Sequence, residues 1–238
     1  MTETPTAPTD NELLNAQMRL EARRAQTKVS VNVKDSLEKA LDRVSKLGPL
    51  LVAATDDKRE RQIAELRAAA GIPSRHNILI TEGDTAWNRK RQEIVARLGN
   101  GFLVALVGVQ GTGKTQMGSA LIYAATQKLL PCKFAVAMDF FIDLKASFDG
   151  KANEAQVIQS YVKPKLLVLD ECDERSESAW ENRLLFHMLN KRYNAMLDTL
   201  LISRRSRDDF MSSLGQSIQS RIQEVGGCIV CDWESFRA

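Results

Sequence analysis

The segment from Gly108 to Thr115, GVQGTGKT, has the spacing of a phosphate-binding loop, Gly-x-x-x-x-Gly-Lys-Thr. The apolar run 102–107 precedes it and an amphipathic stretch, 116–130, follows it. A glycine-rich loop between a buried strand and a helix directs free backbone N–H groups toward an anion. The predicted nucleotide-binding residues of this segment are Gly108, Val109, Gln110, Gly111, Thr112, Gly113, Lys114, Thr115 and Gln116. In this motif Lys114 reaches the β- and γ-phosphates and the Thr115 hydroxyl binds Mg²⁺.

An acidic pair, Asp170 and Glu171, ends a second apolar run, KLLVLDE, at 165–171. Asp170 is predicted to hold Mg²⁺ through water. Glu171 is predicted to orient or deprotonate the water that attacks ATP. A glutamate directly after the aspartate favours an ATPase, with ATP and Mg²⁺ as ligands, over a kinase that phosphorylates a small molecule.

Alternating strands and helices from about residue 76 onward must position these residues. The expected strands cover 102–107, 132–138, 165–171, 198–203 and 228–233. The expected helices cover 84–98, 116–130, 139–148, 177–196 and 207–213, with a further helical segment at 216–223. Alternation at this spacing predicts an α/β fold, with a parallel sheet covered by helices on both faces.

The first 70 residues differ, because they are highly charged and predict helices at 11–26, 35–47 and 55–73. Their apolar stripes are thin; that of 35–47 consists of Leu37, Leu41 and Val44. Such stripes bury little by themselves, which indicates that this part docks on another molecule. The predicted domains are a helical partner-binding region (1–58), a linker helix (59–75) and an ATPase core (76–238).

The composition limits the protein class. A chain of 238 residues, 44% of them hydrophobic, is long enough for one core with a smaller appendage. A net charge of +3 leaves any nucleic-acid site to a local patch. The sequence contains neither an apolar run of the ~18–20 residues needed to cross a membrane nor a secretory signal, so we expect a cytoplasmic protein. Cys228 and Cys231 lie in a β-like run and should face opposite ways, which favours reduced structural thiols over a metal site.

From about residue 59 onward the sequence resembles the DnaC-type replicative helicase loaders, their phage relatives and the related IstB transposition ATPases, all of the AAA+ class. The resemblance rests on RERQIAELRAAAGIPSRH (59–76), FIDLKASFDG (141–150), GQSIQSRI (215–222) and VCDWESFR (230–237). It implies an AAA+ P-loop core after a small helical N-terminal domain. Because only seven residues follow Cys231, we expect no C-terminal helical lid.

The resemblance also implies roles at the subunit interface and at the γ-phosphate. Arg221 matches an arginine finger supplied to a neighbouring subunit, in a ring or spiral of six subunits with the helicase; a solvated helix arginine is the alternative. Arg204 stands where the family usually has a γ-phosphate-sensing asparagine, and Ser203 precedes it. Either residue could take that role, or hydrolysis could be slow.

The positions that match the family's single-stranded DNA contacts are Lys145, Phe148, Ser178 and Trp180. Phe148 also has helical spacing with Phe141 and Leu144, so core packing is its alternative role. The polar neighbours of Trp180 predict an exposed ring. The function implied is ATP-dependent loading of a DnaB-type helicase hexamer onto single-stranded DNA. The alternative is an IstB-like ATPase that regulates a transposase.

Overall fold

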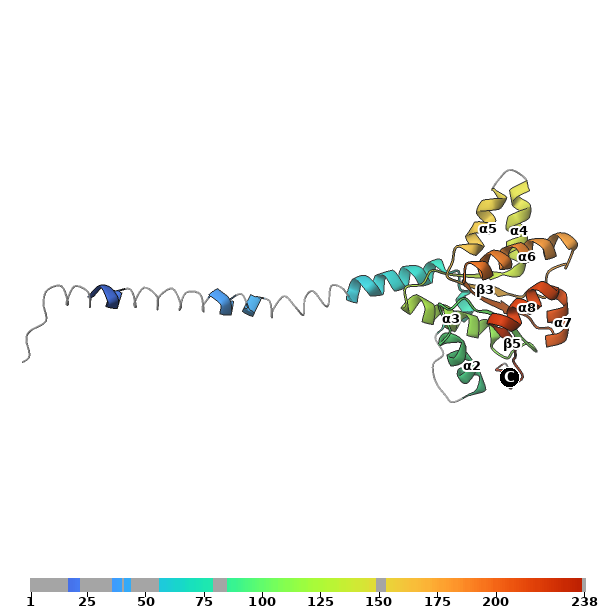
Figure 1. Ribbon diagram of the computed structural model, residues 1–238. Helices are drawn as coiled ribbons and strands as arrows, with labels where there is room; N and C mark the ends of the chain where they lie inside the picture. Colours follow the sequence, from blue (N-terminus) through green and yellow to red (C-terminus); the bar gives the residue numbers. More distant parts are fainter. Residues whose placement is uncertain are drawn as a thin grey trace, which may run out of the picture. The chain divides into compact units, whose positions relative to one another are not determined.

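A computed structural model of the chain describes residues 17–21, 36–39, 41–43, 56–78, 85–148 and 153–236 (Figure 1). The chain divides into two compact units, 1–59 and 60–238. In the first unit the described segments are helical and lie within the predicted helices. Leu37 and Leu41 are exposed there, whereas Val44 lies outside the described residues.

A parallel five-stranded sheet forms the centre of the second unit, in the order β2-β3-β4-β1-β5. Its strands are β1 (Leu103–Val107), β2 (Cys132–Val136), β3 (Leu166–Asp170), β4 (Asp198–Ile202) and β5 (Gly227–Val230). Every residue of β1, β3 and β4 is buried, as expected for strands covered on both faces. The predicted α/β sheet is confirmed.

Helices cover both faces of this sheet (Figure 1). One face packs against α2 (Ala86–Val95) and α3 (Lys114–Gln127). The other packs against α4 (Ala137–Phe148), α5 (Glu154–Val162), α6 (Ala179–Asn194), α7 (Arg207–Leu214) and α8 (Gln216–Val225). Alternate residues of β1 point to opposite faces of the sheet. Val104 packs in the core with α2 and α3, and Ala105 packs in the core with α4 to α8.

Helix α5 is missing from the sequence prediction, which placed a single helix between β2 and β3. It begins at the N-cap Asn153, whose side chain accepts a hydrogen bond from the N–H of Ala155 (2.9 Å). The Tyr161 ring lies 4.8 Å from that of Phe140 on α4, and its hydroxyl donates to Asp143 (2.9 Å). These contacts place α4 and α5 side by side (Figure 1).

The predicted linker helix is observed over 56–69 and is followed by the 3₁₀ turn η1 (Ser74–His76). Gly71 ends the helix with φ of 74°. The segment is joined to the sheet because the Ala70 carbonyl accepts from the N–H of Phe134 (2.7 Å). It also contacts α3, where the guanidinium of Arg67 lies 4.0 Å from the centre of the Tyr123 ring.

The strand β5 is shorter than predicted, since it ends at Val230 rather than at residue 233. Cys231 still donates its N–H to Val107 (2.8 Å), but the chain then leaves the sheet toward the β1–α3 loop. Cys228 and Cys231 enter the two different cores, as expected for opposite faces of a strand. Within the described part of the chain, no helix has the length and apolar character to cross a membrane.

Candidate nucleotide-binding site

The β1–α3 loop has a conformation that requires glycine. Gly108, Gly111 and Gly113 have φ of 130°, 91° and 76°. A Cβ on Gly108 would lie 2.7 Å from the carbonyl oxygen of Cys231, and one on Gly113 would lie 3.0 Å from the Trp87 indole nitrogen. The segments that carry Cys231 and Trp87 therefore pack directly against the loop.

Part of the loop accepts hydrogen bonds from donors outside it. Three consecutive carbonyl oxygens accept hydrogen bonds: Gly111 from the N–H of Phe236 (2.9 Å), Thr112 from the Trp233 indole (2.7 Å) and Gly113 from the Trp87 indole (3.0 Å). In a trans peptide the N–H points away from the preceding C=O. The N–H groups of residues 112–114 therefore point away from these donors, and oriented N–H groups of this kind form an anion site.

Lys114, the first residue of α3, is the buried cation of the loop and is only 5% exposed. Its ammonium donates to the carbonyls of Gly108 (2.6 Å) and Val109 (2.7 Å) and lies 3.3 Å from the Thr112 hydroxyl. Burial lowers the pKa of Lys114, and the nearby Asp170 opposes this effect.

Asp170 ends β3 and lies close to the start of α3. Its carboxylate is buried, accepts the N–H of Glu171 (2.8 Å) and is bonded to the Thr115 hydroxyl. Burial raises the pKa of Asp170, and these hydrogen bonds only partly offset it. Glu171 is exposed and has φ of 52°, an unusual value for a residue with a side chain.

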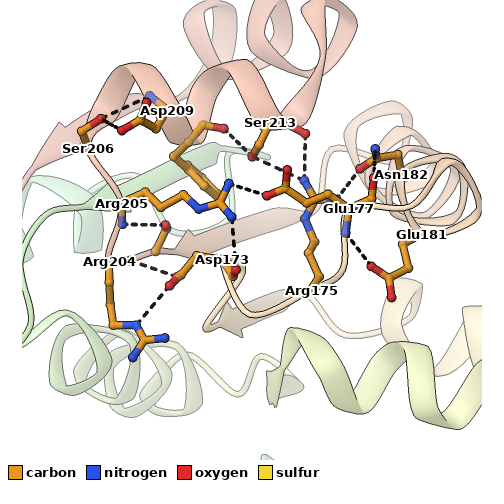
Figure 2. Close-up of polar contacts among 12 residues, drawn as sticks. Asp173, Arg175, Glu177, Glu181, Asn182, Arg204, Arg205, Ser206, Asp209 and Ser213 are labelled. Atoms are coloured by element: carbon orange, nitrogen blue, oxygen red, sulfur yellow. Dashed lines mark hydrogen bonds and ion pairs between the residues drawn. The ribbon is translucent and has the colours of Figure 1, made fainter.

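Ser203 and Arg204 follow β4, the strand between β1 and β3. Ser203 is fully buried, and its hydroxyl accepts the N–H of Arg205 (3.1 Å). The Arg204 side chain pairs with Asp173 at 3.0 Å (Figure 2). It also pairs with Glu174. Burial opposes ionisation of Asp173, yet its bonds to Arg204 lower the pKa of this carboxyl below its usual value.

These elements enclose one pocket of about 350 Å³. The predicted residues that line it are Gln110, Gly111, Gly113, Lys114, Thr115, Gln116, Asp170, Glu171, Ser203 and Arg204. Gly108, Val109 and Thr112 belong to the loop but do not line the pocket. The lining also includes residues that the sequence analysis missed, namely His76, Thr85, Trp87, Asn88, Asp173, Ile202 and Phe236. No spacing in the sequence links them to the loop.

The family model of the IstB-like ATP binding proteins matches residues 91–220, which include the whole phosphate loop and the strands β1 to β4. The chain belongs to this family. The IstB-like chain is 21% identical over 155 residues to the replicative helicase loader DnaC of Escherichia coli K12, covering 64% of this chain and 63% of that protein. It is 26% identical over 142 residues to a putative ATP-binding protein in an insertion sequence of Mycobacterium tuberculosis, covering 58% and 56%. It thus spans less than two thirds of either relative's length.

The fold is shared with a solved structure of a helicase loader. The crystal structure of the DnaC helicase loader superposes with a TM-score of 0.55 at 22% identity, covering 63% of this chain and 92% of that one. The predicted AAA+ P-loop fold and the predicted resemblance to the DnaC and IstB proteins are both confirmed. For the IstB-like chain, this likeness establishes the fold alone.

Arg221 of this IstB-like protein lies outside the pocket lining. It is half-buried on α8, and its guanidinium stacks on two rings of α6, those of Phe186 (5.4 Å) and Tyr193 (4.9 Å). Its Nη1 is buried and has no hydrogen-bond partner among the described residues. Arg221 is therefore not part of the pocket formed by its own chain.

Two of the predicted DNA contacts lie together. The Lys145 ammonium is 5.8 Å from the centre of the Trp180 ring. Trp180 is half-buried rather than exposed, because the first turn of α6 packs it against Phe141 of α4, with ring centres 6.1 Å apart. Its polar sequence neighbours therefore gave a wrong prediction.

The other two predicted DNA contacts have different surroundings. Ser178 is the N-cap of α6, and its hydroxyl accepts the N–H of Glu181 (3.3 Å). Phe148 is the last residue of α4, and its side chain lies outside the described residues. Phe141 and Leu144, with which it shares helical spacing, are both core residues.

Proposed function

We propose that the pocket binds and hydrolyses ATP. The N–H groups of the loop and the Lys114 ammonium would bind the β- and γ-phosphates, with Lys114 exchanging its two loop carbonyls for phosphate oxygens. The neighbouring Thr115 hydroxyl and Asp170 carboxylate are hard oxygen ligands that suit Mg²⁺. When bound, Mg²⁺ neutralises phosphate charge.

Glu171 is the proposed group that orients or deprotonates the attacking water. The observation that supports this is its left-handed backbone at the pocket, since such strain is retained mainly where function requires it. Ser203 and Arg204, at the end of the adjacent strand, are the proposed γ-phosphate sensors. Hydrolysis should be slow, because Arg204 is already paired with Asp173 and Glu174.

Arg221 would act as an arginine finger on the pocket of a neighbouring copy. Its place outside the pocket of its own chain and its unpartnered Nη1 support this role. The aromatic rings beneath the guanidinium would hold it in position. A finger supplied in trans requires at least a second copy, and we propose assembly into a ring or spiral with six subunits beside the helicase.

For the whole chain, we propose ATP-dependent loading of a DnaB-type helicase hexamer onto single-stranded DNA. The observation that carries this proposal is the match of the core to a replicative helicase loader. The adjoining Lys145 and Trp180 suit a single strand, since a cation contacts phosphates and an aromatic ring stacks on bases. The N-terminal helices would bind the helicase, and the exposed Leu37 and Leu41 are the proposed contacts.

The alternative is an IstB-like regulator of a transposase. The family match and the relative from an insertion sequence support it. The two functions differ in DNA substrate and partner. A loader should prefer single strands and co-purify with a replicative helicase, whereas an IstB-like regulator should prefer duplex DNA and a transposase.

The proposed chemistry is tested with Glu171→Gln. This variant should bind ATP like the parent but not hydrolyse it, because an amide cannot act as a base. Hydrolysis at the parent rate would refute the role of Glu171.

The proposed partner is tested by co-purification with the replicative helicase of the host, with and without ATP. Leu37→Asp should abolish that complex, whereas Lys39→Asp, on the opposite side of the same helix, should preserve it.

A further inference from the structure

The lining of the pocket combines two chemically different sets of residues. Lys114, Thr115 and Asp170 are charged or polar. Trp87 and Phe236 are large aromatic residues. A nucleoside triphosphate has the same division, since its phosphates are charged and its base is an aromatic ring.

The Phe236 ring is exposed although its backbone is fixed. The side chain is 61% exposed, yet its N–H donates to the Gly111 carbonyl (2.9 Å). The edge of the ring lies against the phosphate loop, since a Cβ on Gly113 would be 3.1 Å from the Phe236 Cε2. An aromatic ring held at the pocket with its surface open can accept a flat ligand.

Trp87 supports the ring from one side only. The two ring centres are 6.5 Å apart at 83°, so an edge meets a face. Trp87 itself is 3% exposed, and its indole is bonded to the Gly113 carbonyl (3.0 Å). The contact therefore orients Phe236 without covering it.

Three separate segments reach the pocket beside the start of α3. The Gln116 amide, in the first turn of α3, is bonded to the linker at His76 and at Ile78, whose carbonyl is 2.5 Å from Nε2. His76 of the linker, Trp87 of α2 and Phe236 of the segment 231–236 all line the pocket. A nucleoside bound beside the phosphate loop could therefore contact these three segments.

We propose that Phe236 contacts the nucleobase, so that the segment 231–236 is a nucleoside-binding element bonded directly to the phosphate loop. This rests on the proposed ATP binding at the same pocket. Stacking on an aromatic ring has no strict base preference, because every base has a π-face. The contact should therefore add affinity for nucleotides in general, while other groups determine which base is preferred.

The experiment compares two ligands, Mg-ATP and Mg-tripolyphosphate, which has no base. Phe236→Ala should weaken ATP binding about 5- to 150-fold, equivalent to ~1–3 kcal/mol at ~1.4 kcal/mol per tenfold. Tripolyphosphate binding by Phe236→Ala should stay at the parent value. The control variant Phe236→Trp, which keeps an aromatic ring, should bind ATP like the parent. Thermal melts of all three proteins check that they are folded.

Two results would overturn the inference. Unchanged ATP binding in folded Phe236→Ala would show that the ring does not contact the base. Equal weakening of both ligands would show that Phe236 only supports the loop. A parent protein that binds neither ligand would instead refute the proposed ATP site, and the inference with it.

Discussion

Trp233→Phe tests whether the phosphate loop depends on hydrogen bonds from the segment that follows β5. The substitution keeps an aromatic ring against the core but removes the indole donor to the Thr112 carbonyl, a bond of 2.7 Å across 121 positions of sequence. A protein hydrogen bond contributes a net ~0.5–1.5 kcal/mol. For a domain of this size, ~1 kcal/mol lowers the melting midpoint by about 2–4 °C.

The effect on ATP binding has an upper limit set by the same energy. Without the bond, the 112–113 peptide can rotate, and binding must restore its orientation. The loss of affinity cannot exceed the energy of that restoration. We therefore expect ATP affinity to fall about 2- to 12-fold. Calorimetric titration with Mg-ATP measures the affinity, and thermal melts measure the stability.

Trp87→Phe is the matched variant, because it removes the corresponding bond to the next carbonyl, that of Gly113 (3.0 Å). Both variants should weaken ATP binding, and their effects should not add, since the two bonds restrain one loop. A Trp233→Phe protein that melts at a lower temperature but binds ATP like the parent would refute the reasoning. In that case the bond stabilises the fold without orienting the loop.

Further predictions concern the carboxylate at the loop, the subunit interface and DNA. Burial raises the pKa of Asp170, so its contribution to stability is greatest below pH 3.8 and is lost as the pH rises through the raised pKa. At pH 7, Asp170→Asn should therefore raise the melting midpoint while weakening Mg-ATP binding, and a lower midpoint would contradict this. Arg221→Ala should lower ATPase activity without weakening ATP binding by the monomer. Mixing the Arg221→Ala protein with the Lys114→Ala protein should restore some activity. If a proven mixed assembly shows no recovery, Arg221 does not act in trans. In titrations, Trp180→Ala should weaken single-strand binding by about 1–3 kcal/mol. Lys145→Ala should instead reduce the salt dependence of binding by about one phosphate contact. If both variants bind single strands like the parent at every salt concentration, this surface is not a DNA contact.

The parallel sheet and the charged end of the pocket were predictable because their signals are local. A strand buried on both faces must be a continuous apolar run, and 102–107, 165–171 and 198–203 each contain one. Carboxyl ends of neighbouring parallel strands meet at one edge of a sheet. Residues that closely follow or end such runs, Lys114 and Asp170 among them, could therefore be assigned to one site from the order of residues alone.

Helix α5 was missed although its signal is present. Val157, Ile158, Tyr161 and Val162 have helical spacing, and Asn153 is a suitable cap. The end of β5 had no such signal, because CIVCDW continues a β-like pattern past Val230. Trp233 leaves the strand since its indole finds an acceptor on the loop, a partner far away in the sequence.

The sequence by itself therefore determined the α/β class, the phosphate loop and the acidic pair, because each depends on residues that are adjacent along the chain. Only the tertiary structure decided what surrounds them. Trp87 of α2 meets Trp233 and Phe236 of the segment after β5 at the same loop. Trp180, with polar neighbours in the sequence, is half-buried because its ring packs against Phe141 of α4. Contacts between distant segments follow from how the helices and the last strand pack on the sheet, and no spacing along the chain encodes that packing.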